Sequence, residues 1–222
     1  MSERAPGWTT RELAARLAMD IPDGAYVNLG IGLPTSVTAH IPPDREVMHH
    51  SENGIVGMGP PPPAGEEDPD LMDAGKNPCT LALGASICDH TVSFTIIRGG
   101  RLDIAVLGGM QVSARGDLAN WRVAGQQLGS VGGAMDLAAG ARQVWVMMTH
   151  TDKSGRPKIV RECTYPLTAA RCVDRIYTTF AVLDVTDDGL VATDLAPGVD
   201  REALEASIEP PVRFAERLPA TP

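Results

Sequence analysis

One pattern constrains the fold of this chain most: a short strand pattern that runs into paired glycines and then into a helical pattern. "AYVNLGI" predicts a strand that enters Gly30 and Gly32, and "PTSVTAHI" then has helical spacing, with Pro34 suited to a first turn. The alternation recurs later, where "LDIAVLGGMQV" predicts a strand and "GGAMDLAAGARQVWVMMTH" a short helix followed by a strand. Such alternation is typical of parallel strands joined by helical crossovers.

Other segments of the chain add helices and antiparallel strands. Thr9 and Glu12 match a capping box and predict a helix over about 10–19, and "TVSFTIIRGG" predicts a helix or strand stopped by glycine. "TDKSGRPKIV" and "FAVLDVTDDGLVATDL" predict hairpins, and Asp200 is suited to cap a last helix over about 201–207. We therefore expect a single α/β domain over residues 1–222, with an open, mostly parallel mixed sheet flanked by helices and C-terminal antiparallel hairpins.

Composition excludes several classes of function. The chain has 43% hydrophobic residues, a formal net charge of −9 and no basic run, so a nucleic-acid surface is not expected. No apolar run reaches the length of a membrane span, and no N-terminal signal pattern is present, which favours a cytoplasmic protein. The four cysteines form no CxxC pair, and we expect no metal site.

The segment "REVMHHSENG" predicts a strand whose C-terminal end delivers Ser51, Glu52 and Asn53 to a loop. Ligands of open α/β sheets bind beyond the carboxyl ends of strands, so Glu52 is a candidate nucleophile as well as an ordinary solvated turn residue. Asn53 and Gly54 permit the unusual backbone angles that fix a side chain in one direction. The segment 57–78, rich in proline, glycine and acidic residues, is interpreted as a lid or a partner-facing loop.

Two neighbouring residue types offer competing chemistry at this loop. Ser51 lacks the GxSxG pattern of a serine nucleophile. His49 and His50 could act as bases, but alternation along a strand places them on opposite faces, so at most one can point at the loop. A structural role for both histidines remains the simpler alternative.

Four motifs in order resemble the β subunits of 3-oxoacid coenzyme A transferases. They are "NLGIGLPT" (28–35), "HSENGIVG" around Glu52, "GGAMDL" (132–137) and "RECTYPLT" (161–168), and the resemblance extends over about residues 9–207. It implies a CoA-transferase-like fold. It also implies that Glu52 attacks an acyl-CoA thioester and that the reaction passes through a mixed anhydride to a glutamyl-CoA thioester, a ping-pong cycle.

The chemistry of a carboxylate nucleophile agrees with this implication. With a reference pKa of about 4.3, a glutamate is ionised near neutral pH without a histidine base, but the tetrahedral oxyanion needs fixed donors. The main-chain N–H groups of Gly132 and Gly133 are candidate donors, although a plain helix-entry turn would use the same glycines.

The family match supplies the other candidate residues. Asn28 corresponds to a recurrent family asparagine that could position Glu52 or a reacting carbonyl, and its alternative is an ordinary turn residue. Lys76, in "DAGKNP", corresponds to a lysine near the CoA, and its alternative is a solvated surface residue. Asn53 and Gly54 are expected to contact the substrate or CoA.

The chain lacks the "GGFG"-like segment of the family's other half, so the resemblance implies a partner α subunit in a heterodimer or a dimer of heterodimers. Coenzyme A is expected as a substrate, with no further cofactor. The implied reaction moves CoA from a donor such as succinyl-CoA to a 3-oxoacid, either acetoacetate or 3-oxoadipate. An acyl-CoA hydrolase and a non-catalytic acyl-CoA-binding module are the alternative functions.

Overall fold

The computed structural model describes residues 5–123, 130–216 and 218. The chain divides into two compact units. We call Ala14–Leu107 with Gly133–Val144 the Glu52 unit, and Met1–Leu13 with Gly108–Gly132 and Trp145–Pro222 the C-terminal unit. The expectation of a single domain stays a prediction.

The sheet of the Glu52 unit has the strand order β5-β1-β2-β3-β4. Strand β1 lies between β2 and β5 and is parallel to both, whereas β2, β3 and β4 are joined by antiparallel pairs. The bounds are β1 (Tyr26–Leu29), β2 (Met48–Ser51), β3 (Ile55–Met58), β4 (Leu81–Ile87) and β5 (Ile104–Gly108), the last residue of β5 lying in the other unit. The parallel part carries the carboxyl ends of β1 and β2 to the same edge of the sheet.

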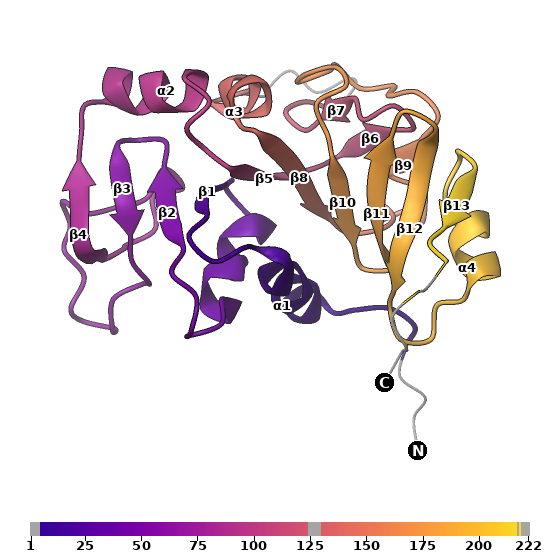
Figure 1. The fold of residues 1–222 in the computed structure, drawn as a ribbon, viewed down its shortest axis with the longest axis horizontal. Helices are drawn as coiled ribbons and strands as arrows, with labels where there is room; N and C mark the ends of the chain where they lie inside the picture. Colours follow the sequence, from indigo (N-terminus) through magenta and orange to yellow (C-terminus); the bar gives the residue numbers. More distant parts are fainter. Residues whose placement is uncertain (1–4, 124–129, 217, 219–222) are drawn as a thin grey trace. The chain divides into compact units, whose positions relative to one another are not determined.

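Two helices of the Glu52 unit, α2 (His90–Arg98) and α3 (Ala134–Gly140), lie side by side (Figure 1). An ion pair between Arg98 Nε and Asp136 Oδ1, 2.6 Å long, links them. Their close approach needs the glycine at the end of α3, since a Cβ on Gly140 would overlap the main-chain oxygen of Ile97. Asp89 caps α2, accepting a hydrogen bond from the N–H of Thr91.

The segment after β1 is a 3-10 helix, η1 (Leu33–His40), where the sequence pattern predicts a helix. The hydroxyls of Thr35, Ser36 and Thr38 each donate to the main-chain oxygen three residues earlier. Such side-chain bonds compete with the α-helical ladder and favour the tighter turn.

The C-terminal unit contains a sheet of order β13-β12-β11-β10-β8 and a small sheet of order β7-β6-β9. The hairpin of β11 and β12 is the predicted antiparallel element, and Asp200 caps the predicted last helix by accepting from the N–H of Ala203. The bounds are β6 (Gln111–Ser113), β7 (Leu118–Ala119), β8 (Gln143–Met148), β9 (Ile159–Val160), β10 (Arg175–Thr178), β11 (Ala181–Thr186), β12 (Gly189–Leu195), β13 (Val212–Phe214) and α4 (Arg201–Ala206).

Each unit has an apolar core built mainly from aliphatic side chains. In the Glu52 unit Leu17, Val27, Ile97, Leu102 and Val106 are fully buried, and in the C-terminal unit Val146, Ile176, Tyr177, Leu183 and Leu204 are fully buried. The first helix, α1 (Thr10–Asp20), begins at the predicted capping box: the hydroxyl of Thr9 accepts from the N–H of Glu12, and Glu12 accepts from the N–H of Thr9. No helix in the described part of the chain is long and apolar enough to cross a membrane.

Two strand predictions were wrong. The single strand expected over "LDIAVLGGMQV" is two strands, β5 and β6, of different sheets, because the chain turns at Gly108 and Gly109 so that the N–H of Met110 donates to Ala119. The segment "TDKSGRPKIV" forms a turn closed by one bridge, Thr151 to Pro157, and its last residues pair with β6 in a parallel direction. The predicted antiparallel turn is therefore present as one bridge, but it adds no antiparallel strands within the described residues.

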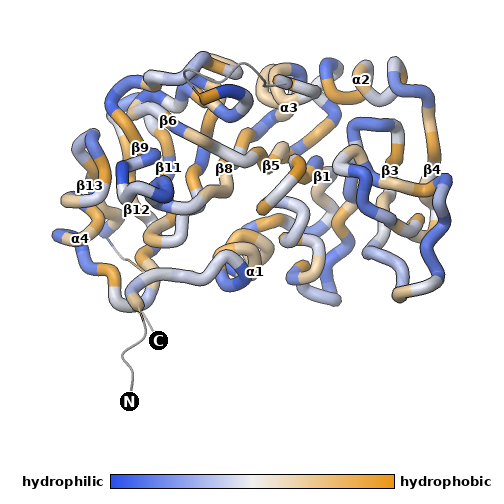
Figure 2. Tube along the Cα trace, turned by 180° about the vertical axis from the view of Figure 1, so that it is seen from behind, coloured by the Kyte–Doolittle hydropathy of each residue, from blue (hydrophilic) through white to orange (hydrophobic). Residues whose placement is uncertain are grey.

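The edge strand β4 was not predicted. Its sequence, LALGASI, is almost entirely apolar, and its hydrophobic residues appear in orange in Figure 2. Because β4 ends the strand order, only β3 pairs with it within the sheet, and its side chains are largely exposed, Leu83 fully so.

Candidate active site

Glu52 lies in the tight turn that joins β2 to β3. The N–H of Gly54 donates to the main-chain oxygen of Ser51 across this turn, at 3.0 Å. Gly54 has a φ of 118°, and a Cβ there would overlap the main-chain oxygen of Cys88. Only glycine fits this position without strain. The turn therefore presents Glu52 in one fixed direction, as the sequence pattern predicted.

Ser51 and Asn53, on either side of Glu52, hold the loop that follows β3. The hydroxyl of Ser51 accepts from the N–H of Ala74 at 2.9 Å, and Asn53 Nδ2 donates to the main-chain oxygen of Met72 at 2.8 Å. Both side chains thus position loop 72–74 beside Glu52. The predicted contacts of Asn53 and Gly54 with substrate or CoA stay predictions.

A buried hydrogen-bonded chain supports the turn from behind. Asn28 Nδ2 lies 3.0 Å from His50 Nδ1 and also donates to the main-chain oxygen of His50. His50 Nε2 lies 3.0 Å from Ser93 Oγ, which donates to the main-chain oxygen of Glu52 at 2.8 Å. Asn28, His50 and Ser93 are 2%, 1% and 0% exposed, so water does not compete for these bonds.

The hydrogen-bond partners of His50 and its burial fix the protonation state and the tautomer of its ring. Burial lowers the pKa of His50 to about 4, so the ring is neutral near neutral pH. The amide nitrogen of Asn28 can only donate, so Nδ1 is the acceptor and Nε2 carries the hydrogen that it donates to Ser93. His50 therefore supports the Glu52 turn, and the sequence expectation that at most one of the two histidines points at the loop stays a prediction.

The Glu52 carboxylate receives a hydrogen bond from the main-chain N–H of Gly133. Burial raises the pKa of Glu52, while the Gly133 bond and the charge of His90 act in the opposite direction and the charge of Asp136 adds to the increase. A Cβ at Gly133 would overlap the carboxylate. Gly132, with a φ of 51°, precedes it in the chain, and its part in the site stays a prediction.

Two cavities of the Glu52 unit meet near the nucleophile. The smaller, of about 20 Å³, is lined by Glu52, Asn28, Ser51 and the loop residues Asp73, Ala74 and Gly75. The larger, of about 490 Å³, shares Thr35, Met58 and Asp73 with the smaller one and has the size of a small-molecule site. The smaller cavity has room for about one water-sized group beside Glu52, and the larger one has room for a small molecule.

Lys76 lines neither cavity. It is exposed and has a φ of 65°, in a turn closed by hydrogen bonds between Asp73 and Asn77. Its role in CoA binding stays a prediction. Sequence reasoning missed Ser93, Thr35 and Asp73. The local pattern carried no signal for Ser93, since the stretch "TVSFTII" also contains the polar residues Thr91 and Thr95.

Comparisons with known proteins identify the family of this chain. The family model described as Coenzyme A transferase matches residues 10–207. Over 195 residues, the chain is 55% identical to the B subunit of 3-oxoadipate CoA-transferase of Pseudomonas putida, covering 87% of this chain and 91% of the relative. It is also 43% identical to the β subunit of acetate CoA-transferase of Escherichia coli, over 90% of this chain and 91% of the relative.

Two solved structures share the fold at low sequence identity. Glutaconate coenzyme A-transferase from Acidaminococcus fermentans superposes with a TM-score of 0.68 at 17% identity, covering 94% of this chain and 89% of that chain. The acyl-CoA transferase YdiF from Escherichia coli O157:H7 gives a TM-score of 0.73 at 22% identity, covering 95% of this chain and 42% of that chain. This chain thus spans less than half the length of YdiF.

The chain belongs to the coenzyme A transferase family, and the predicted fold class, an α/β fold with an open mixed sheet and antiparallel C-terminal strands, is confirmed. Within that family the chain is the B subunit of a CoA-transferase. Coenzyme A is accordingly a substrate of the family's reaction.

Proposed function

We propose that this chain carries the covalent nucleophile of a transferase that moves CoA from an acyl-CoA donor such as succinyl-CoA to 3-oxoadipate. The observation that carries the proposal is the Glu52 carboxylate, held by a rigid turn at a small cavity and hydrogen-bonded to the N–H of Gly133. The choice of acceptor rests on the relatives: 3-oxoadipate transferases are 52–55% identical to this chain, and the succinyl-CoA:3-ketoacid relative of Bacillus subtilis is 45% identical.

The reaction begins when a Glu52 carboxylate oxygen attacks the thioester carbonyl. The C–S bond breaks, giving a mixed anhydride and CoA thiolate. The thiolate then attacks the Glu52 acyl carbon, forming a glutamyl-CoA thioester and releasing the donor acid. The acceptor carboxylate attacks this thioester, and the thiolate returns to the acceptor acyl carbon, which regenerates Glu52.

The environment of Glu52 suits this chemistry. Burial raises the pKa of Glu52, which makes its carboxylate more basic and so a better nucleophile than a solvated one. When the Glu52 acyl group becomes tetrahedral, the N–H of Gly133 can donate to its oxyanion, as it donates to the resting carboxylate. One such main-chain donor is worth about 10²-fold to 10³-fold in rate.

An assembly with an α subunit is part of the proposal. The relatives are named as B or β subunits, and the acidic residues Glu52 and Asp73 at the cavity leave the charges of an anionic substrate to be met from elsewhere. The exposed apolar edge strand β4 offers a surface that a partner would cover. We expect a heterodimer or a dimer of heterodimers.

The test is to trap the intermediate. The chain is mixed with succinyl-CoA in the presence of its α subunit, treated with hydroxylamine, and digested for mass spectrometry. A modification confined to the peptide that contains Glu52 and absent from Glu52→Gln is expected. An unmodified Glu52 in a complex that binds CoA would favour a non-catalytic acyl-CoA-binding module, and acid release without an acceptor would favour a hydrolase.

A further inference from the structure

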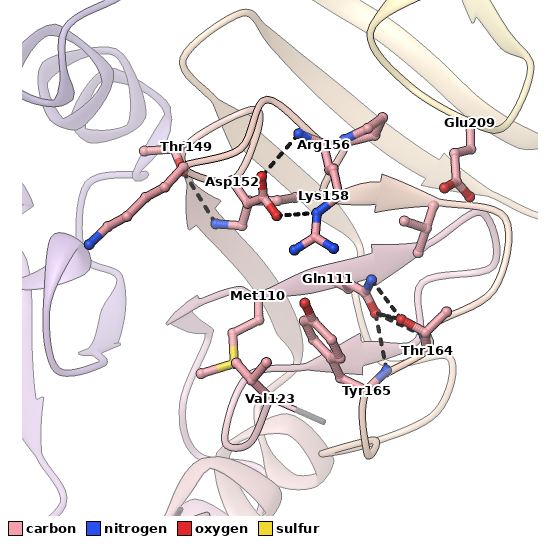
Figure 3. Close-up of a pocket in the computed structure, with 13 residues that line it drawn as sticks. Met110, Gln111, Val123, Thr149, Asp152, Arg156, Lys158, Thr164, Tyr165 and Glu209 are labelled. Atoms are coloured by element: carbon pink, nitrogen blue, oxygen red, sulfur yellow. Dashed lines mark hydrogen bonds and ion pairs between the residues drawn. The ribbon is translucent and has the colours of Figure 1, made fainter. Parts of the chain in front are cut away.

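The C-terminal unit contains a cavity of about 510 Å³ that the reaction at Glu52 does not use. One wall is the turn between β8 and β9, which contributes Lys153, Arg156 and Lys158 (Figure 3). The opposite wall includes Gln111 of β6 and Tyr165. The volume lies in the range of small-molecule sites.

The cationic wall is held rigid by Asp152. Its carboxylate accepts from the N–H of Ser154 at 2.7 Å and from the N–H of Arg156 at 3.0 Å, and it forms a 2.7 Å ion pair with Arg156 Nε. Figure 3 shows this pair, with the terminal nitrogens of Arg156 directed away from Asp152. The turn therefore presents its cations in fixed positions, and the charge of Asp152 is compensated within the turn.

Lys158 is the cation that most needs a partner. It is half-buried, and the nearest group bonded to Nζ is the hydroxyl of Thr149, at 3.4 Å. No carboxylate of the described residues lies within ion-pair distance of Nζ. Burial lowers the pKa of Lys158 to about 8, although the charge of Asp152 opposes this. An ammonium group in such a place gains stability when an anion joins it.

The opposite wall is also fixed, and it is less polar. The Gln111 side chain accepts from the N–H groups of Thr164 and Tyr165, at 2.8 and 3.2 Å. These bonds fix the main chain that carries the Tyr165 ring. Figure 3 shows the Tyr165 ring beside Met110, on the side of the cavity facing Arg156. Val123, Pro157 and Val160 add apolar lining, while Glu209, whose carboxylate accepts from the N–H of Arg161, also lines the cavity.

We propose that this cavity binds a small organic oxyanion, with its carboxylate or phosphate group at Arg156 and Lys158 and its carbon skeleton against Tyr165 and Met110. A planar guanidinium and an ammonium together suit an oxyanion, because the first can bind two oxygens and the second supplies a point charge. Two prearranged walls keep the ordering cost of binding low. All the lining residues belong to the C-terminal unit, so the site is distinct from that of Glu52.

The test is a calorimetric titration of the full chain with succinate, with phenyl phosphate and with the neutral analogue succinamide. We expect millimolar or tighter binding of at least one anion and none of succinamide. Lys158→Met should weaken binding about tenfold, because it removes a charge-assisted hydrogen bond. If one of the two anions binds more tightly than the other, the result supports the proposal and shows whether the cavity prefers a carboxylate or a phosphate group.

The controls separate this site from the Glu52 unit and from misfolding. Arg101→Met removes an exposed cation of the Glu52 unit, one with no role at either site, and should leave the affinity unchanged. Arg156→Gln gives a second variant, and the far-UV circular dichroism of each variant reports its folding. Binding should persist in the complex with the α subunit. The proposal is overturned by an absence of anion binding, by equal binding of succinamide, by unchanged affinity in Lys158→Met, or by loss of binding in that complex.

Discussion

The ring of His50 and the hydroxyl of Ser93 are joined by a 3.0 Å contact, through which a neutral histidine supports the main chain of the nucleophile. Ser93→Ala would leave His50 Nε2–H and the Glu52 carbonyl without this partner, at about 1–3 kcal/mol for each buried group. We expect kcat of CoA exchange to fall about tenfold with KM for acyl-CoA unchanged, since Ser93 lines neither cavity.

A matched control lies on the same helix. The hydroxyl of Thr95 donates to the main-chain oxygen of Thr91, and the side chain is exposed. Thr95→Ala should therefore keep the kcat of the parent chain. Equal losses in the two variants would show that Ser93 acts only through helix stability.

Glu52→Asp tests whether position matters as well as charge. The shorter side chain keeps the carboxylate but withdraws it from the N–H of Gly133 by about the length of one methylene. We expect exchange to fall at least 10²-fold and Glu52→Gln to abolish it, with CoA binding retained in both. Steady-state kinetics with succinyl-CoA and 3-oxoadipate measure the exchange rate of each variant, and calorimetry with CoA measures its CoA binding. Wild-type exchange in Glu52→Gln would refute the covalent mechanism.

Gly133→Ala places a methyl group where the Glu52 carboxylate lies. The carboxylate must move away, and we expect kcat to fall about 10²-fold while the thermal midpoint changes little, because the site opens to a cavity. Gly108→Ala is the control, since a Cβ there meets nothing and its φ is ordinary. A fully active Gly133→Ala would remove the main-chain donor from the mechanism.

The buried histidines make stability depend on pH. The pKa values of His50 and His150 are lowered by burial from 6.5 to about 4, so between these values the unfolded chain binds more protons than the folded chain. The free energy of unfolding should therefore decrease as the pH falls from about 6.5 to about 4, by at most about 3 kcal/mol for each residue. Above about pH 6.5, both histidines are neutral in the folded and the unfolded chain, so neither adds to the pH dependence of the free energy of unfolding.

Urea unfolding at about pH 7 and about pH 5 measures this dependence. His150→Asn should flatten it, because the hydroxyls of Thr178 and Ser207 can bond an amide in place of the ring. An identical dependence in the variant and the parent chain would contradict the assignment to His150.

The edge strand β4 tests the proposed assembly. Leu83 is fully exposed, so Leu83→Asp should leave the thermal midpoint of the isolated chain unchanged. Within the assembled complex, a buried aspartate would lack a partner, and we expect the dissociation constant to rise at least tenfold by sedimentation velocity. Met19→Asp, on α1 and 55% exposed, is the matched control. Unaltered assembly of Leu83→Asp would exclude β4 from the interface.

The local features of the fold were predictable because they depend on neighbouring residues. Thr9 with Glu12, Asp200, and the hairpin around Asp187 and Gly189 each carry their own signal. The strand β4 was missed because an apolar edge strand has no alternation to reveal it. The parallel pairing of β9 with β6 depends on contacts distant in sequence, which a turn pattern cannot report.

In the site, too, features set by neighbouring residues were predictable, and features set by contacts distant in sequence were not. The turn around Gly54 was predictable because its backbone geometry restricts the residues that fit, whereas the catalytic role of Glu52 stays a prediction from its motif. Ser93 was missed because its partners, His50 and the Glu52 carbonyl, are 43 and 41 residues away in sequence. The cationic cavity in the C-terminal unit was missed for a similar reason: "TDKSGRPK" resembles any solvated turn until Gln111 and Tyr165 are placed opposite it.

The proline-rich segment is clamped at its base. The N–H of Gly59 donates to Thr80, and the N–H and hydroxyl of Thr80 donate to Pro60, while Ser51 and Asn53 fix residues 72–74. Residues 61–70 thus form a loop whose two ends are fixed, and lengthening such a loop costs little free energy. For protein engineering, this makes residues 63–66, which line neither cavity of the Glu52 unit, the place where a tag or a new loop can be inserted while the reach of Glu52 stays the same.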